Sequence, residues 1–269
     1  MLAVQDHRAI YDREFEQYKK YELENWRISY LKRVFDFLAV PPQNVTSEDR
    51  FLDVGVGGSG YTTIEAARRG LESVGVDISA KGMSKAQSFA KEALAACQHD
   101  MCHFVVCAAD YLPFKGAVFS KVCSIAVLEH IPADTQAIAE MSRVVMLNGR
   151  VFITVPNAYR RMLPVFWLPY LIHDRKVGHL RHYKAETIVE RFVKRGFALY
   201  DLVYHVHLTK IVQYLLSKIF PQLRKPNSRI WWKLENLDFA VRKLPTGLHF
   251  SASMIKLSIQ HIPNMISKR

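Results

Sequence analysis

Residues 51–63, FLDVGVGGSGYTT, constrain the fold more than any other stretch of this sequence. Phe51, Leu52 and Val54 have the pattern of a buried strand end, and residues 62–69 have helical spacing and composition. Between them stand four glycines, Gly55, Gly57, Gly58 and Gly60. Glycines let a turn bring its backbone close to a ligand, and the N–H groups of the helix that follows favour polar or anionic atoms. The stretch predicts a strand, a ligand-binding turn and a helix.

Two acids flank this turn and indicate which ligand it binds. A second apolar run, SVGVDIS at residues 73–79, ends at Asp77, about 20 residues after the turn, where a carboxylate accepts hydrogen bonds from a ribose diol. Asp53 stands two positions before the first glycine. A carboxylate there would repel a pyrophosphate but suits a cation such as an α-ammonium or sulfonium. The pair favours a nucleoside-type cofactor that carries positive charge.

The rest of the chain alternates between strand and helix patterns. Residues 6–40 read as one or two helices, which end before Pro41 and Pro42. Strands are then expected at residues 50–55, 73–77, 103–107, 120–126 and 150–155. Helices are expected at residues 61–69, 80–97, 134–145 and 185–195. Such alternation predicts an α/β fold, a doubly wound parallel sheet with helices on both faces.

Several segments resemble a known family in the expected order. The turn resembles motif I of the class I S-adenosylmethionine (SAM) methyltransferases, acid-x-Gly-x-Gly-x-Gly, although Ser59 stands where the third glycine is usual. Residues 107–114, 119–131 and 141–157 resemble later segments of the same fold. GHLRHYKAETIVERFVKRGF, residues 178–197, resembles the ubiquinone- and menaquinone-biosynthesis-like branch, methyltransferase type 11/12. The resemblance spans residues 45–205 and implies a SAM-dependent methyltransferase.

The resemblance also implies a fold and a set of cofactor contacts. The expected fold is a Rossmann-like, seven-stranded, mostly parallel sheet, completed by an antiparallel pair near residues 199–205 and 251–258. Asp110 would hold the adenine amino group, the Tyr111 amide would meet the ring, and Ala126 would line the methionine moiety. The expected cofactor-binding residues are Asp53, Gly55, Gly57, Gly58, Gly60, Asp77, Ile78, Asp110, Tyr111 and Ala126.

Domain boundaries follow from this assignment. Residues 1–45 are expected to form an N-terminal helical cap over the cofactor pocket. Residues 46–206 and 251–260 would form the methyltransferase core. Residues 157–183 and 207–250 are longer than the connections that the simplest members need, and such long connections usually have a function. We interpret them as insertions that form a candidate acceptor-site lid, with aromatic side chains such as Trp167 and Tyr170 for an apolar pocket.

The charge of the chain, +12, must also be explained. The positive excess lies after residue 140, where basic residues alternate with bulky apolar ones, as in HLTKIVQYLLSKIFPQLRK. Interfacial helices have this mixture, whereas RNA-binding surfaces show basic patches with polar linkers. The pattern favours an anionic membrane surface over nucleic acid, with a solvated basic face as the third interpretation. The residues expected to meet head groups are Arg160, Arg161, Lys210, Lys218, Arg224 and Lys225.

No run of about 18 apolar residues is present, and the N-terminus has no apolar segment of signal-peptide length. A cytoplasmic protein is therefore expected, with peripheral association to a membrane. The four cysteines, Cys97, Cys102, Cys107 and Cys123, form no CxxC pair. Their spacing to histidines matches no zinc site, so we expect neither a metal site nor a metal-dependent mechanism.

Transfer of a methyl group to an oxygen or nitrogen requires the acceptor to lose a proton, which a histidine can take. The candidate general bases are His130, His182 and His179, with Glu129 a weaker candidate. The sequence predicts a small, hydrophobic or lipid-like acceptor and leaves its identity, the methylated atom (O, N or C) and the oligomeric state open. The alternatives are an RNA or tRNA methyltransferase, a non-catalytic SAM-fold binding protein, and a nucleotide-dependent oxidoreductase, against which Asp53 and Asp110 argue.

Overall fold

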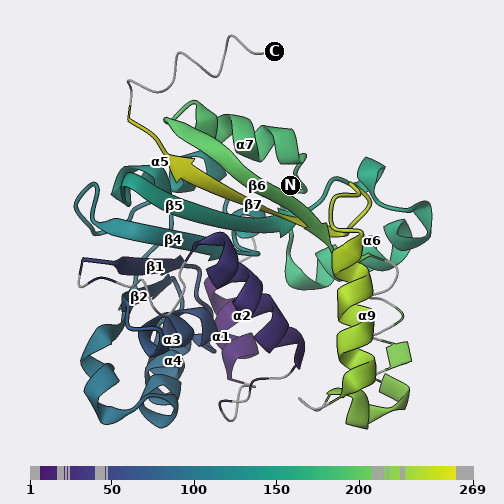
Figure 1. Cartoon of the computed structure of the whole chain (residues 1–269), viewed down its shortest axis with the longest axis horizontal. Coiled ribbons are helices and arrows are strands. Elements are labelled where there is room, and N and C mark those ends of the chain that lie inside the picture. The colour runs from purple at the N-terminus through teal and green to yellow at the C-terminus, as the bar shows by residue number, and fades with distance from the viewer. Residues whose placement is uncertain are drawn as a thin grey trace.

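The computed structural model describes residues 7–16, 21, 23, 25–39, 46, 48–207, 212, 215, 216, 218–224 and 228–258. A twisted sheet crosses the molecule, with helices on both of its faces (Figure 1). In the described residues the sheet has seven strands in the order β3-β2-β1-β4-β5-β7-β6. Its strands are β1 Arg50–Val54, β2 Glu72–Asp77, β3 Cys102–Val106, β4 Phe119–Ile125, β5 Val145–Pro156, β6 Phe197–His205 and β7 His249–Lys256. The predicted doubly wound fold is confirmed.

The pairing pattern creates the place where a ligand can bind. β1 to β5 run parallel to one another, while β7 is antiparallel to both of its neighbours, β5 and β6. From β1 the chain winds outward through β2 to β3 and then returns to the other side of β1 as β4. This reversal leaves a crevice at the carboxyl ends of β1 and β4, which is where open α/β sheets bind ligands.

Helices and short 3-10 turns connect these strands. The helices are α1 His7–Phe15, α2 Asn25–Phe37, α3 Tyr61–Arg68, α4 Ala80–Ala93, α5 Asp134–Val144, α6 Trp167–Val177, α7 Ala185–Val193 and α9 Arg229–Ala240. The 3-10 turns are η1 Ala96–Met101, η2 Leu128–His130, η3 Tyr159–Arg161, η4 Pro164–Phe166 and η5 Pro221–Arg224.

Two of the predicted boundaries were wrong by four or five residues. The helix expected to run to residue 97 ends at Ala93, because Leu94 is extended and η1 follows. β5 begins five residues earlier than predicted, since Val145 pairs with Phe119 across an irregularity in the β4–β5 register.

The core lies on both faces of the sheet. On one face, α5 and α7 bury Ile138, Met141, Ile188 and Phe192 against the apolar side chains of the central strands. On the other face, α2 buries Val34, Phe35 and Leu38 against Phe51 and Phe152. α2 is therefore a layer of the core. The division into an N-terminal cap, a core and two insertions stays a prediction.

Candidate functional site

A cavity of about 1030 Å³ lies at the carboxyl ends of the parallel strands. Most of the predicted cofactor residues line it, namely Asp53, Gly55, Gly57, Gly58, Asp77, Ile78, Asp110 and Ala126. The base candidates His130 and His179 also line it. Gly60, Tyr111 and His182 do not belong to its lining. The sequence motifs and the acceptor-side histidines thus meet in one space.

The conformation and packing of the turn explain why glycines stand in it. Gly55 and Gly57 have φ values of 79° and 64°, in the left-handed region that favours glycine. Gly58 has a steric reason instead, since a Cβ atom there would come within 2.7 Å of the Phe15 side chain. Phe15 ends α1 and lines the cavity beside the turn. The end of α1 therefore packs on the turn.

Gly60 and Tyr111 are the two predicted cofactor residues outside the cavity lining. Gly60 precedes α3 in a left-handed conformation, with φ 63°, so it starts the helix and does not contact the cavity. Tyr111 is 79% exposed. The expectation for Tyr111 concerned its backbone amide, which donates to the Ala108 carbonyl oxygen at 3.1 Å. The cofactor roles of both residues stay predictions.

Asp77 ends β2 with its carboxylate directed at backbone donors. It accepts hydrogen bonds from the amides of Gly57 at 3.0 Å and Ser79 at 2.9 Å. Burial raises the pKa of this carboxyl, and the two hydrogen bonds oppose the rise. A carboxylate has about four lone-pair sites, so Asp77 keeps acceptor capacity for the hydroxyls of a ribose.

Asp53 ends β1 below the turn. Thr63 donates to it at 3.1 Å and the Cys123 thiol at 3.2 Å, and the side chain is nearly fully buried. Burial raises the pKa of Asp53 to about 6. A buried carboxylate with neutral donors keeps its charge more readily beside a cation, which agrees with the role expected for it.

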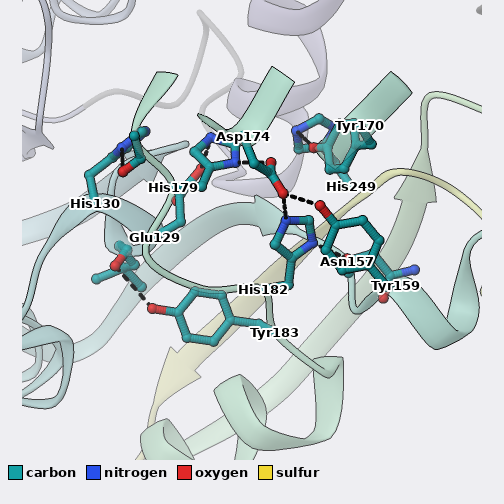
Figure 2. Close-up of polar contacts among 12 residues, drawn as sticks. Glu129, His130, Asn157, Tyr159, Tyr170, Asp174, His179, His182, Tyr183 and His249 are labelled. Carbon is teal, nitrogen blue, oxygen red and sulfur yellow. Dashed lines mark hydrogen bonds and ion pairs between the residues drawn. The ribbon is translucent and has the colours of Figure 1, made fainter. Parts of the chain in front are cut away.

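Asp174 organises the other end of the cavity (Figure 2). His179 Nδ1 lies 2.6 Å from Asp174 Oδ1, and His182 Nε2 lies 2.7 Å from Oδ2. The Tyr159 hydroxyl also donates to Oδ2. Burial by itself would raise the pKa of Asp174, but these hydrogen bonds lower it. Asp174 is therefore an anion that holds two histidines and a tyrosine in place.

The three base candidates differ in what they face. His182 holds both ring nitrogens in hydrogen bonds, since its Nδ1 lies 2.7 Å from the Asn157 carbonyl oxygen. His130 and His179 both line the cavity, with ring centroids 4.8 Å apart. Burial lowers the pKa of His179 in spite of Asp174, so its neutral form is favoured. His130 and His179 thus lie at the surface of the cavity, whereas His182 contacts Asp174 and is not part of the lining; its role as a base stays a prediction.

Glu129, between these histidines in Figure 2, is fully buried. Neither of its carboxylate oxygens has a hydrogen-bond partner among the described residues. Its Oε1 lies 4.0 Å from His179 Nε2. Burial raises the pKa of Glu129 to about 8.

Part of the chain is similar in sequence to a known protein family. Residues 52–153 match the methyltransferase domain family. The match begins in β1, ends in β5, and contains both strand-end acids and the glycine turn. It agrees with the SAM cofactor expected from the sequence. No curated protein sequence is significantly similar to this chain.

Solved structures of two methyltransferases and a cyclase share the fold. Geranyl diphosphate C-methyltransferase from Streptomyces coelicolor, solved with S-adenosylhomocysteine, has a TM-score of 0.60 and 15% identity over 86% of this chain and 76% of that one. Phosphoethanolamine N-methyltransferase 2 from Haemonchus contortus, solved with SAM, has a TM-score of 0.58 and 20% identity over 95% of this chain and 61% of that one. The [4+2]-cyclase SpnF has a TM-score of 0.55 and 17% identity over 85% and 80%.

Outside the methyltransferase match, the structure brings together residues that sequence reasoning missed. His173 and His249 line the cavity as well. The segment LIHDRKVGHLRHY contains Asp174 between histidines, and this local pattern could have indicated the cluster. His205 and His249 are paired across β6 and β7, with ring planes 12° apart. No local sequence signal predicts this register.

α9, which lies in the second of the predicted insertions, reaches the cavity. Asp238 of α9 lines the cavity and accepts a hydrogen bond from the His207 amide at 2.9 Å. Glu235 accepts one from the Ser29 hydroxyl of α2 at 2.8 Å and pairs with Arg33. α9 therefore borders one side of the cavity. Movement of this element stays a prediction.

Proposed function

We propose that this protein is a SAM-dependent methyltransferase that acts on a small, hydrophobic molecule. The observation that carries this proposal is the continuity of one cavity from the glycine turn and Asp77 to a cluster of histidines. Bound in this cavity, SAM would supply a methyl group activated by a sulfonium. The donor set suits it, because Asp77 keeps free acceptor sites and Asp53 offers a buried carboxylate to a cation.

Each end of the cavity would have its own task. Asp77 would accept from the ribose hydroxyls, Asp110 from the adenine amino group, and the turn amides would meet the remaining polar atoms. α1 would exclude water, since Phe15 already lies on the glycine turn. Holding donor and acceptor in contact can supply about 7–11 kcal/mol of the barrier, which makes positioning the main contribution of the protein.

His130 and His179 would act on the acceptor. Because Asp174 bonds Nδ1 of His179, the Nε2 atom carries the lone pair in the neutral ring. Such a nitrogen can take part in removing the proton of an oxygen or nitrogen acceptor.

Surface composition supports a hydrophobic acceptor. Of twenty large apolar side chains exposed in the described residues, fourteen lie in residues 157–183 and 207–250. On α6, Leu168 and Ile172 are 68% and 61% exposed, while His173 and Val177 of the same helix line the cavity. None of the described helices combines the length and the hydropathy needed to cross a bilayer. We propose that these insertions rest on an anionic membrane surface and pass a lipid-like acceptor to the cavity.

The structure describes some of the basic residues that are proposed to contact the membrane surface. Arg160 and Lys218 are exposed and Arg161 is partly exposed. Lys210 and Lys225 lie outside the described residues, and the side chain of Arg224 is not described. The net charge of +12 would attract the chain to anionic lipids over distances of a Debye length.

Calorimetric titration of the full chain with SAM, S-adenosylhomocysteine and NAD tests the cofactor. We expect SAM and its demethylated product to bind and NAD not to bind. Methyl-labelled SAM is then incubated with the protein and either a lipid extract or total RNA, with Asp77→Ala as the inactive control. Label in the organic phase is expected. NAD binding without SAM binding would contradict the cofactor, label in RNA would contradict the acceptor, and SAM binding without any transfer would favour a non-catalytic protein.

A further inference from the structure

Glu129 is a buried acid whose surroundings leave it unsatisfied. It lies in η2, directly after β4, with no exposed surface. Both carboxylate oxygens lack a hydrogen-bond partner among the described residues. A buried polar group without a partner is costly, and folded proteins rarely retain one unless a ligand, a water or an ion meets it. We therefore expect the Glu129 carboxylate to have a bound partner.

Two histidines present nitrogens to the same space. His179 is held through its Nδ1 by Asp174 at 2.6 Å, which leaves Nε2 toward Glu129 Oε1 at 4.0 Å. The His130 ring packs beside His179, and its Nδ1 lies 3.4 Å from the Gly178 carbonyl oxygen. One ligand atom from each of Glu129, His130 and His179 lies within 4.8 Å of the other two.

The distance between Glu129 Oε1 and His179 Nε2 is the one expected for two atoms that bind the same metal ion. A distance of 4.0 Å between Glu129 Oε1 and His179 Nε2 is too long for a hydrogen bond. An ion about 2.1 Å from each of two ligand atoms holds them at most about 4.2 Å apart.

We propose that Glu129, His130 and His179 bind one divalent transition-metal ion at the acceptor end of the cavity. Two imidazoles and one carboxylate suit Zn²⁺, Mn²⁺, Fe²⁺ or Co²⁺ better than Mg²⁺ or Ca²⁺, which prefer oxygen ligands throughout. Asp174 is then a positioning residue, because a carboxylate on the far nitrogen of a histidine fixes its tautomer and orients it toward a metal. His182 and Tyr159 hold Asp174 in turn. This site differs from the sequence expectation of no metal, since its ligands come from segments almost 50 residues apart in the chain.

The ion would face the substrate space. His130 and His179 line the cavity, so an ion on them has open positions directed into it. If the proposed function holds, an acceptor hydroxyl bound there would have a lowered pKa, which favours an oxygen acceptor. His130 and His179 would then promote loss of its proton as ligands of the ion, in place of acting as the base themselves.

The test uses the full chain after treatment with a chelator. Zn²⁺ and Mn²⁺ are titrated calorimetrically, and Co²⁺ is added as a probe whose visible absorption reports coordination. We expect one ion per chain for at least one of these metals, and a loss of affinity of about 100-fold or more in Glu129→Gln and in His179→Gln. Asp174→Asn should lose about 10–100-fold, as positioning residues of metal sites do.

The matched controls are Glu190→Gln and His103→Gln, which alter an exposed acid and an exposed histidine far from the cavity and should bind metal as the wild type does. Circular dichroism checks that each variant is folded. Absence of binding at millimolar metal, or equal affinity in wild type, Glu129→Gln and His179→Gln, would overturn the metal site. SAM titration of the same samples separates the two proposals: SAM binding without metal binding defeats this inference alone, and metal binding without SAM binding defeats the proposed function.

Discussion

Asp53 and Asp77 end neighbouring strands, yet the fold gives them different partners. Asp77 receives backbone amides from the glycine turn and from the start of α4, and it keeps lone pairs toward the cavity. Asp53 receives side-chain donors from α3 and β4 in a fully buried position. Under the proposed function, Asp77 would accept from hydroxyls of the cofactor and Asp53 would place negative charge below the turn.

Replacement of Asp77 by alanine should weaken SAM binding, because charge-assisted hydrogen bonds to the ribose are lost. The expected loss is about 1.5–3 kcal/mol, roughly 10- to 150-fold in the dissociation constant. Calorimetric titration measures it, with the exposed Asp100→Ala as the control that should bind normally. Unchanged affinity in a folded Asp77→Ala protein would remove the ribose assignment.

His130→Ala and His179→Gln should each lower turnover by about 10²-fold or more, since both side chains face the acceptor end. SAM affinity should hardly change, because neither histidine is one of the expected cofactor-binding residues. His182→Gln should lower turnover less, because both ring nitrogens of His182 already form hydrogen bonds, with Asp174 and with the Asn157 carbonyl oxygen. Single-turnover kinetics with labelled SAM give the three rates. A larger loss in His182→Gln than in the other two would reverse this ranking.

At the level of elements, Asp134 joins three segments that shape the histidine cluster. It begins α5 and accepts from Tyr183 at 2.8 Å and from Arg191 of α7 at 2.7 Å. Arg181 pairs with its other oxygen at 2.9 Å. Arg181 and Tyr183 follow His179 directly in the chain, and the Leu180 amide donates to the Glu129 carbonyl oxygen at 2.9 Å. This carboxylate therefore fixes the segment that carries His179.

Asp134→Asn should lower the free energy of unfolding by about 2 kcal/mol at pH 7. Burial by itself would raise the pKa of Asp134, but hydrogen bonds from Arg191, Tyr183 and Arg181 lower it to about 2. A lowered pKa contributes stability that is present above the unfolded-state value near 4 and disappears as the pH falls toward 2. Urea unfolding at pH 7, 4 and 2.5 measures the difference, with Asp100→Asn as control. A difference that persists undiminished at pH 2.5 would contradict this origin.

For the whole molecule, the distribution of apolar and basic side chains is the informative feature. The exposed apolar residues gather on the insertions beside the acceptor end, while the cofactor end is covered by α1. The overall positive charge acts at longer range than these contacts. A surface of this kind suits contact with anionic lipid, where each basic residue adds about 1 kcal/mol and salt weakens the sum.

The protein should float with vesicles that contain anionic lipid, bind neutral vesicles much more weakly, and detach as salt increases. The double variant Leu168→Ser with Ile172→Ser should reduce flotation, because both side chains are exposed on α6. Leu147→Ser alters a comparably exposed leucine outside the insertions and is the matched control. Equal, negligible flotation with both lipid mixtures would leave a methyltransferase for small molecules in solution.

The cofactor half of the site could be predicted from the sequence because its determinants are local. A strand end, a glycine turn and a helix start follow one another within residues 51–63, and each acid stands at the end of its own strand. The parallel sheet then brings these ends together at one edge, whatever the loops contain. Gly60 lies outside the cavity lining, because the shifted glycine spacing uses it to begin α3, and its cofactor role stays a prediction.

The acceptor half was decided by tertiary structure. His130, His179 and Asp174 come from different segments, and only the packing of the insertion after β5 against η2 makes them neighbours. The same packing ranks His179 above His182 and leaves Glu129 buried without a hydrogen bond. A residue's type and spacing determine what it can do within its own element, whereas burial and partners depend on segments distant in the chain. The sequence alone therefore predicted the nucleoside-binding edge, and the fold determined the geometry in which an acceptor would be met.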